Sequence, residues 1–173
     1  MKMMKILAAA AVVGALAWVS TSTRVGAEDN TAREARDRVE IEALMWKYTR
    51  ALDTGNAEAY AAVYTPDGQF GNGPNATKGR DALKKMITGV ADRQKAAEAK
   101  GEPRPPMYHM TMNSRLSFAD KDHARIEAYW QTVFGAVGQN VPVRVAAAGR
   151  SVDQLVRVNG QWLIQNRDVA PKD

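Results

Sequence analysis

Hydrophobic side chains recur every three or four residues in the first half of the chain, the spacing of amphipathic helices. The first such stretch runs from Thr31 to Leu52, and its apolar positions are Val39, Ile41, Leu44, Met45, Tyr48 and Leu52. The break at residues 54–56 supplies a helix stop and a new N-cap, so a short second helix is predicted over Ala57–Tyr64. A third helix is predicted from Arg80 towards Ala99, with a polar, solvated second half.

The segments between these helices carry turn chemistry. Pro66-Asp67-Gly68 predicts a turn, and a short strand is expected near Gln69-Phe70. The Gly-, Asn- and Pro-rich residues 71–79 are typical of a loop, and residues 101–106 are typical of an extended connector.

The period changes to two in the second half of the chain, which is the pattern of β-strands. Strands are predicted over Met107–Phe118 and His123–Phe134, and a third begins over Val141–Ala148. The dipeptide Asn159-Gly160 predicts a type I′ hairpin turn between strands 152–158 and 161–167. Within the first strand, strict alternation places His109, Thr111, Asn113 and Arg115 opposite Met110, Met112, Leu116 and Phe118.

Helices followed by antiparallel strands favour an α+β fold, with the helices packed on one face of a curved sheet. We find no internal repeat in the sequence, and its length is that of a single ordinary domain after an export signal.

The first 27 residues are typical of an export signal. Lys2 and Lys5 give a basic start, residues 6–19 are apolar, and Val25-Gly26-Ala27 makes a cleavage site before Glu28. The expected location is therefore the periplasm or the extracellular space, with a retained membrane anchor as the alternative. The chain has no cysteine, so neither disulfides nor a cysteine-linked lipid anchor can form.

The net charge of +5 depends largely on this leader, because cleavage removes Lys2, Lys5 and Arg24. The remaining 21 basic and 19 acidic side chains give a mature net charge of +2. A nearly balanced charge without a dense basic stripe argues against nucleic acid as a partner.

Two residues break local preferences and are therefore candidates for function. Asp53 lies at the end of a helix, where its charge opposes the helix dipole, and His109 lies within a strand. Together they would form an aspartate–histidine general-base dyad. The structural alternatives are that Asp53 begins a turn and that His109 is a solvated strand residue. His123 belongs to a charged turn and is expected to be exposed.

Other kinds of site are disfavoured by the sequence. Two histidines without a nearby carboxylate motif do not make a zinc site, and residues 71–74 lack the lysine of a phosphate-binding loop. No serine lies in a nucleophile-elbow context. We therefore expect no metal and no cofactor.

Four segments resemble SnoaL-like proteins of the nuclear transport factor 2-like superfamily in order and spacing. They are residues 48–56 (YTRALDTGN), 64–68 (YTPDG), 108–113 (YHMTMN) and 157–162 (RVNGQW) continuing to Arg167. The resemblance covers nearly the whole mature chain, residues 28–173. It implies a cone-shaped α+β barrel in which a strongly curved, mixed or antiparallel sheet wraps around the N-terminal helices and leaves an internal pocket.

Within that superfamily the chain is most similar to two elimination enzymes, bile-acid 7α-dehydratase and hexachlorocyclohexane dehydrochlorinase. The resemblance implies catalytic roles for Asp53, His109 and Arg167, and the dehydratase adds a tyrosine at the position of Tyr48. The dehydrochlorinase has a lysine there, so the chain departs from it. Tyr48 could instead be a core tyrosine, and Arg167, expected on the strand face opposite Trp162, could form a surface salt bridge.

The resulting hypothesis is a cofactor-independent lyase that eliminates water or another small group from a small hydrophobic, cyclic molecule. Two alternatives are an isomerase on the same scaffold and a non-catalytic domain that binds a ligand or a partner protein. A homodimer is expected through the outer sheet face, where Tyr129, Trp130 and Phe134 would supply apolar area. No stable membrane association is expected after cleavage.

Overall fold

The computed structural model describes residues 4–102, 104–137 and 141–172, with only the backbone described for residues 4–28. A single long helix, α1 (Met4–Thr54), contains the helix predicted from Thr31. The chain divides into two compact units, residues 1–40 and 41–173, and all the features below belong to the second unit. The predicted export signal, residues 1–27, lies outside the residues whose side chains are described. Among the described residues, no helix is long and apolar enough to span a membrane.

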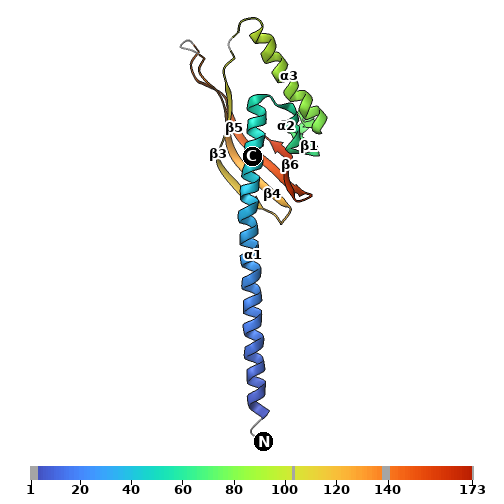
Figure 1. Cartoon of the computed structure of the whole chain (residues 1–173), viewed down its shortest axis with the longest axis vertical. Helices are drawn as coiled ribbons and strands as arrows, with labels where there is room; N and C mark the ends of the chain where they lie inside the picture. Colours follow the sequence, from blue (N-terminus) through green and yellow to red (C-terminus); the bar gives the residue numbers. More distant parts are fainter. Residues whose placement is uncertain (1–3, 103, 138–140, 173) are drawn as a thin grey trace. The chain divides into compact units, whose positions relative to one another are not determined.

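The other elements follow the predicted order of helices first and strands afterwards. They are α2 (Ala57–Ala62), β1 (Tyr64–Phe70), a short 3₁₀ helix (Gly73–Asn75), β2 (Thr77–Lys78), α3 (Arg80–Glu98), β3 (Met107–Phe118), β4 (His123–Phe134), β5 (Arg144–Val158) and β6 (Gln161–Asp168). Figure 1 shows α2 and α3 beside β1, with the C-terminal part of α1 running along the sheet. The predicted α+β class is confirmed.

The six strands form one mixed sheet in the order β2-β1-β6-β5-β4-β3. Only the β1–β6 pair is parallel, and β5 pairs with β4 and β6 in an antiparallel arrangement. The order leaves β2 and β3 as edges, so the sheet is curved but open. The predicted barrel is therefore wrong in this respect, because no hydrogen bonds join the first and last strands.

One core lies between the helices and the inner face of the sheet. Its buried helical side chains include Ile41, Leu44, Tyr48, Tyr60 and Leu83, and its strand side chains include Ile126, Leu155, Trp162 and Ile164. Burial of this apolar surface is the main favourable term for folding, in a chain that has no disulfide to assist it.

A bulge in β3 changes which side chains face this core. Residues 113 and 114 together oppose the single residue Ala128, and Asn113 has a φ of 50°. The extra residue reverses the alternation, so His109 and Thr111 face inward on one side of the bulge, and Leu116 and Phe118 face inward on the other. The predicted separation of His109 from Leu116 and Phe118 onto opposite faces is therefore wrong.

A second bulge has the same effect in β6. The hairpin turn pairs Val158 with Gln161 and Leu155 with Ile164, but beyond Gln165 the register shifts and Asp153 pairs with Arg167. Trp162 and Arg167 therefore both lie on the inner face, where each is almost fully buried. Their predicted placement on opposite faces is wrong because strict alternation does not continue through a bulge.

Three further differences concern where elements begin and end. Residues 66–68, predicted as a turn, lie inside β1, where the pairing with β6 is interrupted between Tyr64 and Gln69. The predicted strands 141–148 and 152–158 are one continuous strand, β5, because β4 pairs with it from Arg144 to Val156. The polar loop predicted over residues 71–79 contains the 3₁₀ helix and β2.

Candidate functional site

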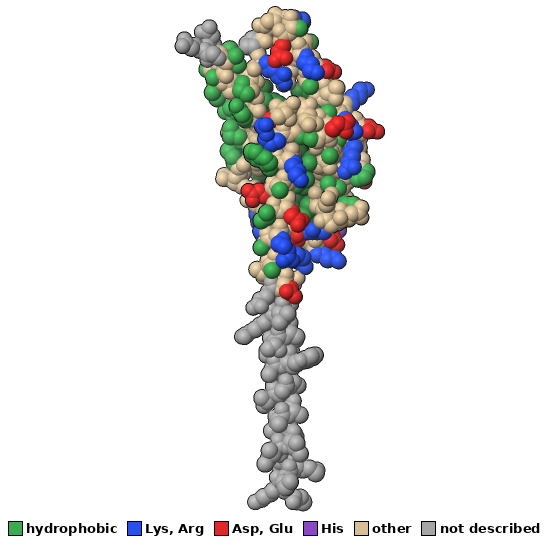
Figure 2. Space-filling view, viewed as in Figure 1, with side chains coloured by type: hydrophobic (Ala, Val, Ile, Leu, Met, Phe, Trp, Pro, Cys, Tyr) green, Lys and Arg blue, Asp and Glu red, His purple; other side chains and the backbone are tan. Residues whose placement is uncertain are grey.

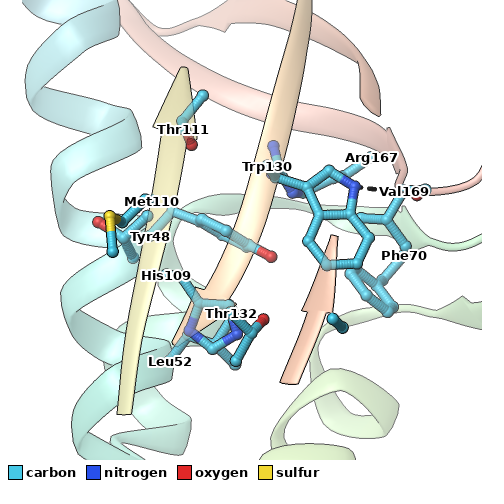
Figure 3. Close-up of a pocket in the computed structure, with 12 residues that line it drawn as sticks. Tyr48, Leu52, Phe70, His109, Met110, Thr111, Trp130, Thr132, Arg167 and Val169 are labelled. Carbon is cyan, nitrogen blue, oxygen red and sulfur yellow. Dashed lines mark hydrogen bonds between the residues drawn. The ribbon is translucent and has the colours of Figure 1, made fainter. Parts of the chain in front are cut away.

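The inner face of the sheet contains a cavity of about 180 Å³ beside the C-terminal part of α1. Its lining residues come from α1 and from five strands, or from the segments that directly adjoin them. They are Tyr48, Thr49, Leu52, Phe70, His109, Met110, Thr111, Trp130, Thr132, Ala147, Arg167 and Val169. Three of the four predicted site residues, Tyr48, His109 and Arg167, are among them (Figure 3). The fourth, Asp53, does not line the cavity but contacts His109.

Asp53 lies in the last turn of α1, which ends at Thr54 and is followed by Gly55. Gly55 has a φ of 67°, and the backbone N–H groups of Gly55 and Asn56 donate to the carbonyls of Leu52 and Ala51. This left-handed C-cap stops the helix and turns the chain away. The Asp53 side chain, only 8% exposed, is thereby left facing β3.

Asp53 makes two hydrogen bonds to His109. Its Oδ1 accepts the backbone N–H of His109 at 2.9 Å and lies 2.7 Å from the ring Nδ1. A carboxylate can only accept hydrogen bonds, so Nδ1 carries the proton and, in the neutral ring, Nε2 keeps a lone pair. The predicted contact between Asp53 and His109 is present, while its catalytic role stays a prediction.

The position of β3 explains why the backbone of His109 is available to Asp53. β3 is an edge strand, so alternate N–H groups have no neighbouring strand to pair with. Asp53 satisfies one of these groups and so ties the end of α1 to the sheet. This bond gives Asp53 a structural role in addition to any chemical one.

An ion pair lies at the base of the cavity. Arg167 Nη1 bonds Asp153 Oδ2, and the two side chains are 4% and 0% exposed. Burial raises the pKa of Asp153 to about 6, and attraction to Arg167 offsets only part of that effect. For Arg167, burial favours loss of the proton, but neighbouring Tyr48 and Asp153 outweigh it, so its pKa lies above the ordinary value. Both groups are therefore charged at neutral pH.

Tyr48 links this ion pair to a cluster of buried tyrosines. The guanidinium carbon of Arg167 lies 4.5 Å from the centre of the Tyr48 ring, a cation–π contact. The Tyr48 ring also packs against Tyr60 and Tyr64, whose hydroxyls are 3.1 Å apart. Burial raises the pKa of both Tyr60 and Tyr64, so these hydroxyls stay neutral. Tyr48 is thus both a core tyrosine and a lining residue.

Trp130 forms a flat wall of the cavity. Its indole Nε1 donates to the carbonyl of Val169 at 3.0 Å (Figure 3). The carbonyl of Arg150 lies 3.2 Å from the same nitrogen. The neighbouring strand carries Gly149 directly opposite Trp130, and a Cβ there would lie 2.8–3.1 Å from three indole atoms. Gly149 therefore gives the indole room to lie across β5.

Sequence reasoning placed Trp130 on the outer face together with Tyr129, which is wrong because neighbouring strand residues face opposite ways. Trp130 lies on the same face of β4 as Ala128, Ile126 and Ala124, all of which are buried. That pattern could have identified Trp130 as an inward-facing residue. Asp153 was also missed. Its signal is an acidic side chain at a core position of the hairpin, two residues from Leu155.

Among the residues with described side chains, no cluster of three histidine, cysteine or carboxylate groups could hold a metal ion. His123 is exposed and bonds Asp120 in the turn before β4, away from the cavity residues. Burial and contact thus distinguish the two histidines of the chain, and only His109 faces the cavity.

The sequence profile of the SnoaL-like domain matches residues 33–168, most of the chain. The chain belongs to the SnoaL-like family. A comparison with curated proteins found no match. The fold is the nuclear transport factor 2-like, cystatin-like fold, as shown by solved structures that superimpose on it.

Three of these structures illustrate how widely the fold is used. This SnoaL-like chain has a TM-score of 0.66 and 23% identity with a nuclear transport factor 2-like protein from Novosphingobium aromaticivorans, covering 83% of this chain and 87% of that one. A protein of unknown function from Mycobacterium tuberculosis has a TM-score of 0.66 and 20% identity, and the match covers 82% of this chain and 75% of that one. A protein named as a candidate scytalone dehydratase, also from N. aromaticivorans, has a TM-score of 0.63 and 24% identity, and the match covers 80% of this chain and 85% of that one. At these identities the likeness shows the fold alone.

Proposed function

We propose that this SnoaL-like chain is an exported lyase that eliminates water from a small hydrophobic, cyclic molecule. The observation that carries the proposal is the contact between Asp53 and His109. It fixes the proton on Nδ1 and leaves the other ring nitrogen as a base beside a mostly apolar cavity. One structure of the same fold belongs to a protein named as a candidate scytalone dehydratase, which agrees with this chemistry.

In the proposed reaction, His109 Nε2 removes a proton from a carbon next to a carbonyl group of the substrate. The electron pair of that C–H bond forms an enolate, and Asp53 stabilises the imidazolium. The enolate then reforms the carbonyl with a new C=C bond, while the C–O bond to the β-hydroxyl breaks. The imidazolium returns its proton to the departing hydroxide, so the products are water and an unsaturated ketone.

Tyr48 and Arg167 lie where they could stabilise negative charge on the substrate. Both line the cavity, and the Tyr48 hydroxyl can donate a hydrogen bond. Hydrogen-bond donors that are already oriented in a water-poor site stabilise a developing oxyanion more than water does. Arg167 would contribute through the guanidinium N–H groups that Asp153 does not bond, because Asp153 bonds Nη1 and offsets the positive charge.

The experiment is a screen of cyclic β-hydroxyketones, with elimination followed by the ultraviolet absorbance of the conjugated product. His109→Ala should lose about 10²–10⁴-fold in rate while keeping the fold. His123→Gln is the matched control, since that histidine is exposed and should tolerate replacement without loss of rate. Equal activity of His109→Ala and the wild type would refute the base assignment.

A second candidate function is a non-catalytic pocket domain, and one observation favours it. Asp53 accepts the backbone N–H of His109, so its conformation has a structural cause that requires no catalysis. Asp53→Asn distinguishes the two candidates, because the amide can still accept the backbone N–H but no longer stabilises an imidazolium. Lost turnover with retained ligand binding supports the lyase, and unchanged properties throughout support the binding domain. Isomerisation would show as a product of unchanged mass.

We also propose export through cleavage after Ala27, on the basis of the leader composition. Periplasmic or extracellular protein whose first residue is Glu28 would support this. Full-length protein retained in a membrane fraction would support the anchor instead.

We propose in addition that the domain pairs through the outer face of its sheet. Tyr108, Tyr129 and Val145 lie on that face of β3, β4 and β5 and are 46%, 55% and 57% exposed. Figure 2 shows hydrophobic side chains gathered along one side of the domain. An exposed apolar surface on neighbouring strands is the kind of area that homodimers bury.

A further inference from the structure

The electrostatic balance of the cavity rests on two buried acids that do not themselves line it. The cavity has two basic lining residues, His109 and Arg167. His109 Nδ1 contacts Asp53, and Arg167 Nη1 contacts Asp153, whose side chain has no exposure. Each group that could carry positive charge thus already has a carboxylate partner. At neutral pH the site has no excess positive charge with which to attract an anion.

We propose that the cavity selects an uncharged, oxygen-bearing compound of one or two rings, and that Asp153 sets this preference by neutralising Arg167. The inference rests on the proposed function only in taking the cavity as a ligand site. It adds the charge class of the ligand and a specificity-determining residue outside the resemblance described above.

The size of the cavity suits a small ring system. A buried apolar cavity of about 150 Å³ in another protein holds one benzene molecule. The present cavity, about 180 Å³, is close to that size and has the flat indole of Trp130 as one wall. A molecule of four fused rings would have to extend outside it.

The polar groups around the cavity suit a neutral oxygen. Thr111 and Thr132 lie on neighbouring strands and line the cavity together with Tyr48. A hydroxyl can donate to a carbonyl or accept from an alcohol, so these three residues can bind either group without a compensating charge. A carboxylate, in contrast, would lose its hydration and would meet no unbalanced cation among the lining residues, which is costly.

The ion pair itself is incompletely bonded, which makes Asp153 a sensitive position. Asp153 Oδ1 and Arg167 Nε are buried and have no hydrogen-bond partner within the described part of the chain. Replacing Asp153 with asparagine keeps the shape but removes the charge, so the field of Arg167 would reach the cavity unopposed. Asparagine has the same shape as aspartate, and burial raises the pKa of Asp153 and so favours an uncharged group at this position; Asp153→Asn should therefore fold.

The test uses benzamide and benzoate, which have nearly the same shape and differ in charge. Binding to the mature wild-type protein at neutral pH is followed by NMR shifts of the cavity residues. We expect benzamide to bind at least about tenfold more tightly than benzoate, a difference of roughly 1.4 kcal/mol. Equal affinities, tighter binding of benzoate, or no binding of either compound would overturn the proposal without any variant being needed.

The variants then assign the preference to Asp153. Asp153→Asn should strengthen benzoate binding by about tenfold and change benzamide binding by less than about twofold. Asp67→Asn is the matched control: it makes the same change in net charge at an exposed position of β1 that does not line the cavity. An equal gain in both variants would show a general charge effect and refute the role of Asp153.

These measurements are separate from the test of catalysis, because they record equilibrium binding of compounds that cannot undergo elimination. Loss of turnover in His109→Ala with no benzamide preference would support the lyase and refute the charge selection. A benzamide preference in a protein that catalyses no elimination would support the charge selection and refute the lyase.

Discussion

Asp153 on β5 and Arg167 on β6 face each other across neighbouring strands and form a buried ion pair beneath the cavity. If the register of the hairpin continued without a bulge, Arg167 would oppose Val152 and not Asp153. The bulge at Gln165 moves Arg167 by one position and turns it inward. A single inserted residue thus creates the charged base of the site.

The pH dependence of stability should report this ion pair. Asp153 has a pKa raised from 3.8 to about 6 in the folded state, so the folded protein binds a proton that the unfolded chain does not hold in this range. This contribution to stability is fully present below 3.8 and is lost as pH rises through about 6. Denaturant unfolding of the wild type and Asp153→Asn across this range measures it. The wild-type free energy of unfolding should fall with rising pH by up to about 1.4 kcal/mol per pH unit relative to the variant. Parallel curves would show that Asp153 titrates normally.

Gly149 should be intolerant of a side chain. Its replacement by alanine places a Cβ against the Trp130 indole, at 2.8–3.1 Å from three ring atoms, and the indole is held by backbone carbonyls. We expect a loss of about 1–3 kcal/mol in stability, measured by denaturant unfolding, with changed tryptophan fluorescence.

The matched control for that substitution is Gly89→Ala in α3. The nearest atom to a Cβ there is the end of the flexible Arg93 side chain at 3.6 Å. A glycine inside a helix costs about 0.5–1 kcal/mol relative to alanine, so this variant should be more stable than the wild type. Destabilisation of both variants by the same amount would argue against a specific clash with Trp130.

The bulge in β3 should depend on the residue at position 113. Asn113 has a φ of 50°, a conformation that asparagine and glycine adopt readily and β-branched residues avoid. Asn113→Val should therefore lower stability by about 1–3 kcal/mol, whereas Asn113→Gly should change it little. Thermal unfolding followed by circular dichroism separates them, and equal melting temperatures would show that the backbone strain is absent.

The proposed homodimer predicts a specific effect of charge on the outer sheet face. Tyr129→Glu places a charge among exposed apolar side chains of β3, β4 and β5 without touching the cavity, since Tyr129 is not a lining residue. Light scattering at micromolar concentration should show a dimer for the wild type and a monomer for the variant. Lys121→Glu, in the exposed turn before β4, is the control and should leave the dimer intact. A monomeric wild type would refute the proposal.

The sequence alone was sufficient for most of the elements and for their order, although it missed β2 and divided β5 into two strands. Helical and strand periodicities located α2, α3, β3 and β4, and the Asn159-Gly160 pair located the β5–β6 hairpin, because each signal is local. The resemblance correctly indicated the family and the fold, and it selected Asp53 and His109, which the structure places in contact.

Only the tertiary structure decided which side chains share a face. Alternation along a strand fixes orientation only while the pairing is regular, and the bulges at residues 113–114 and at Gln165 each reverse it. His109 therefore lies on the same face as Phe118, and Arg167 lies on the same face as Trp162, although strict alternation along the strand would separate both pairs. The partnership of Asp153 with Arg167 and the inward position of Trp130 depend on pairing with a neighbouring strand, which is a property of the sheet and not of any one segment.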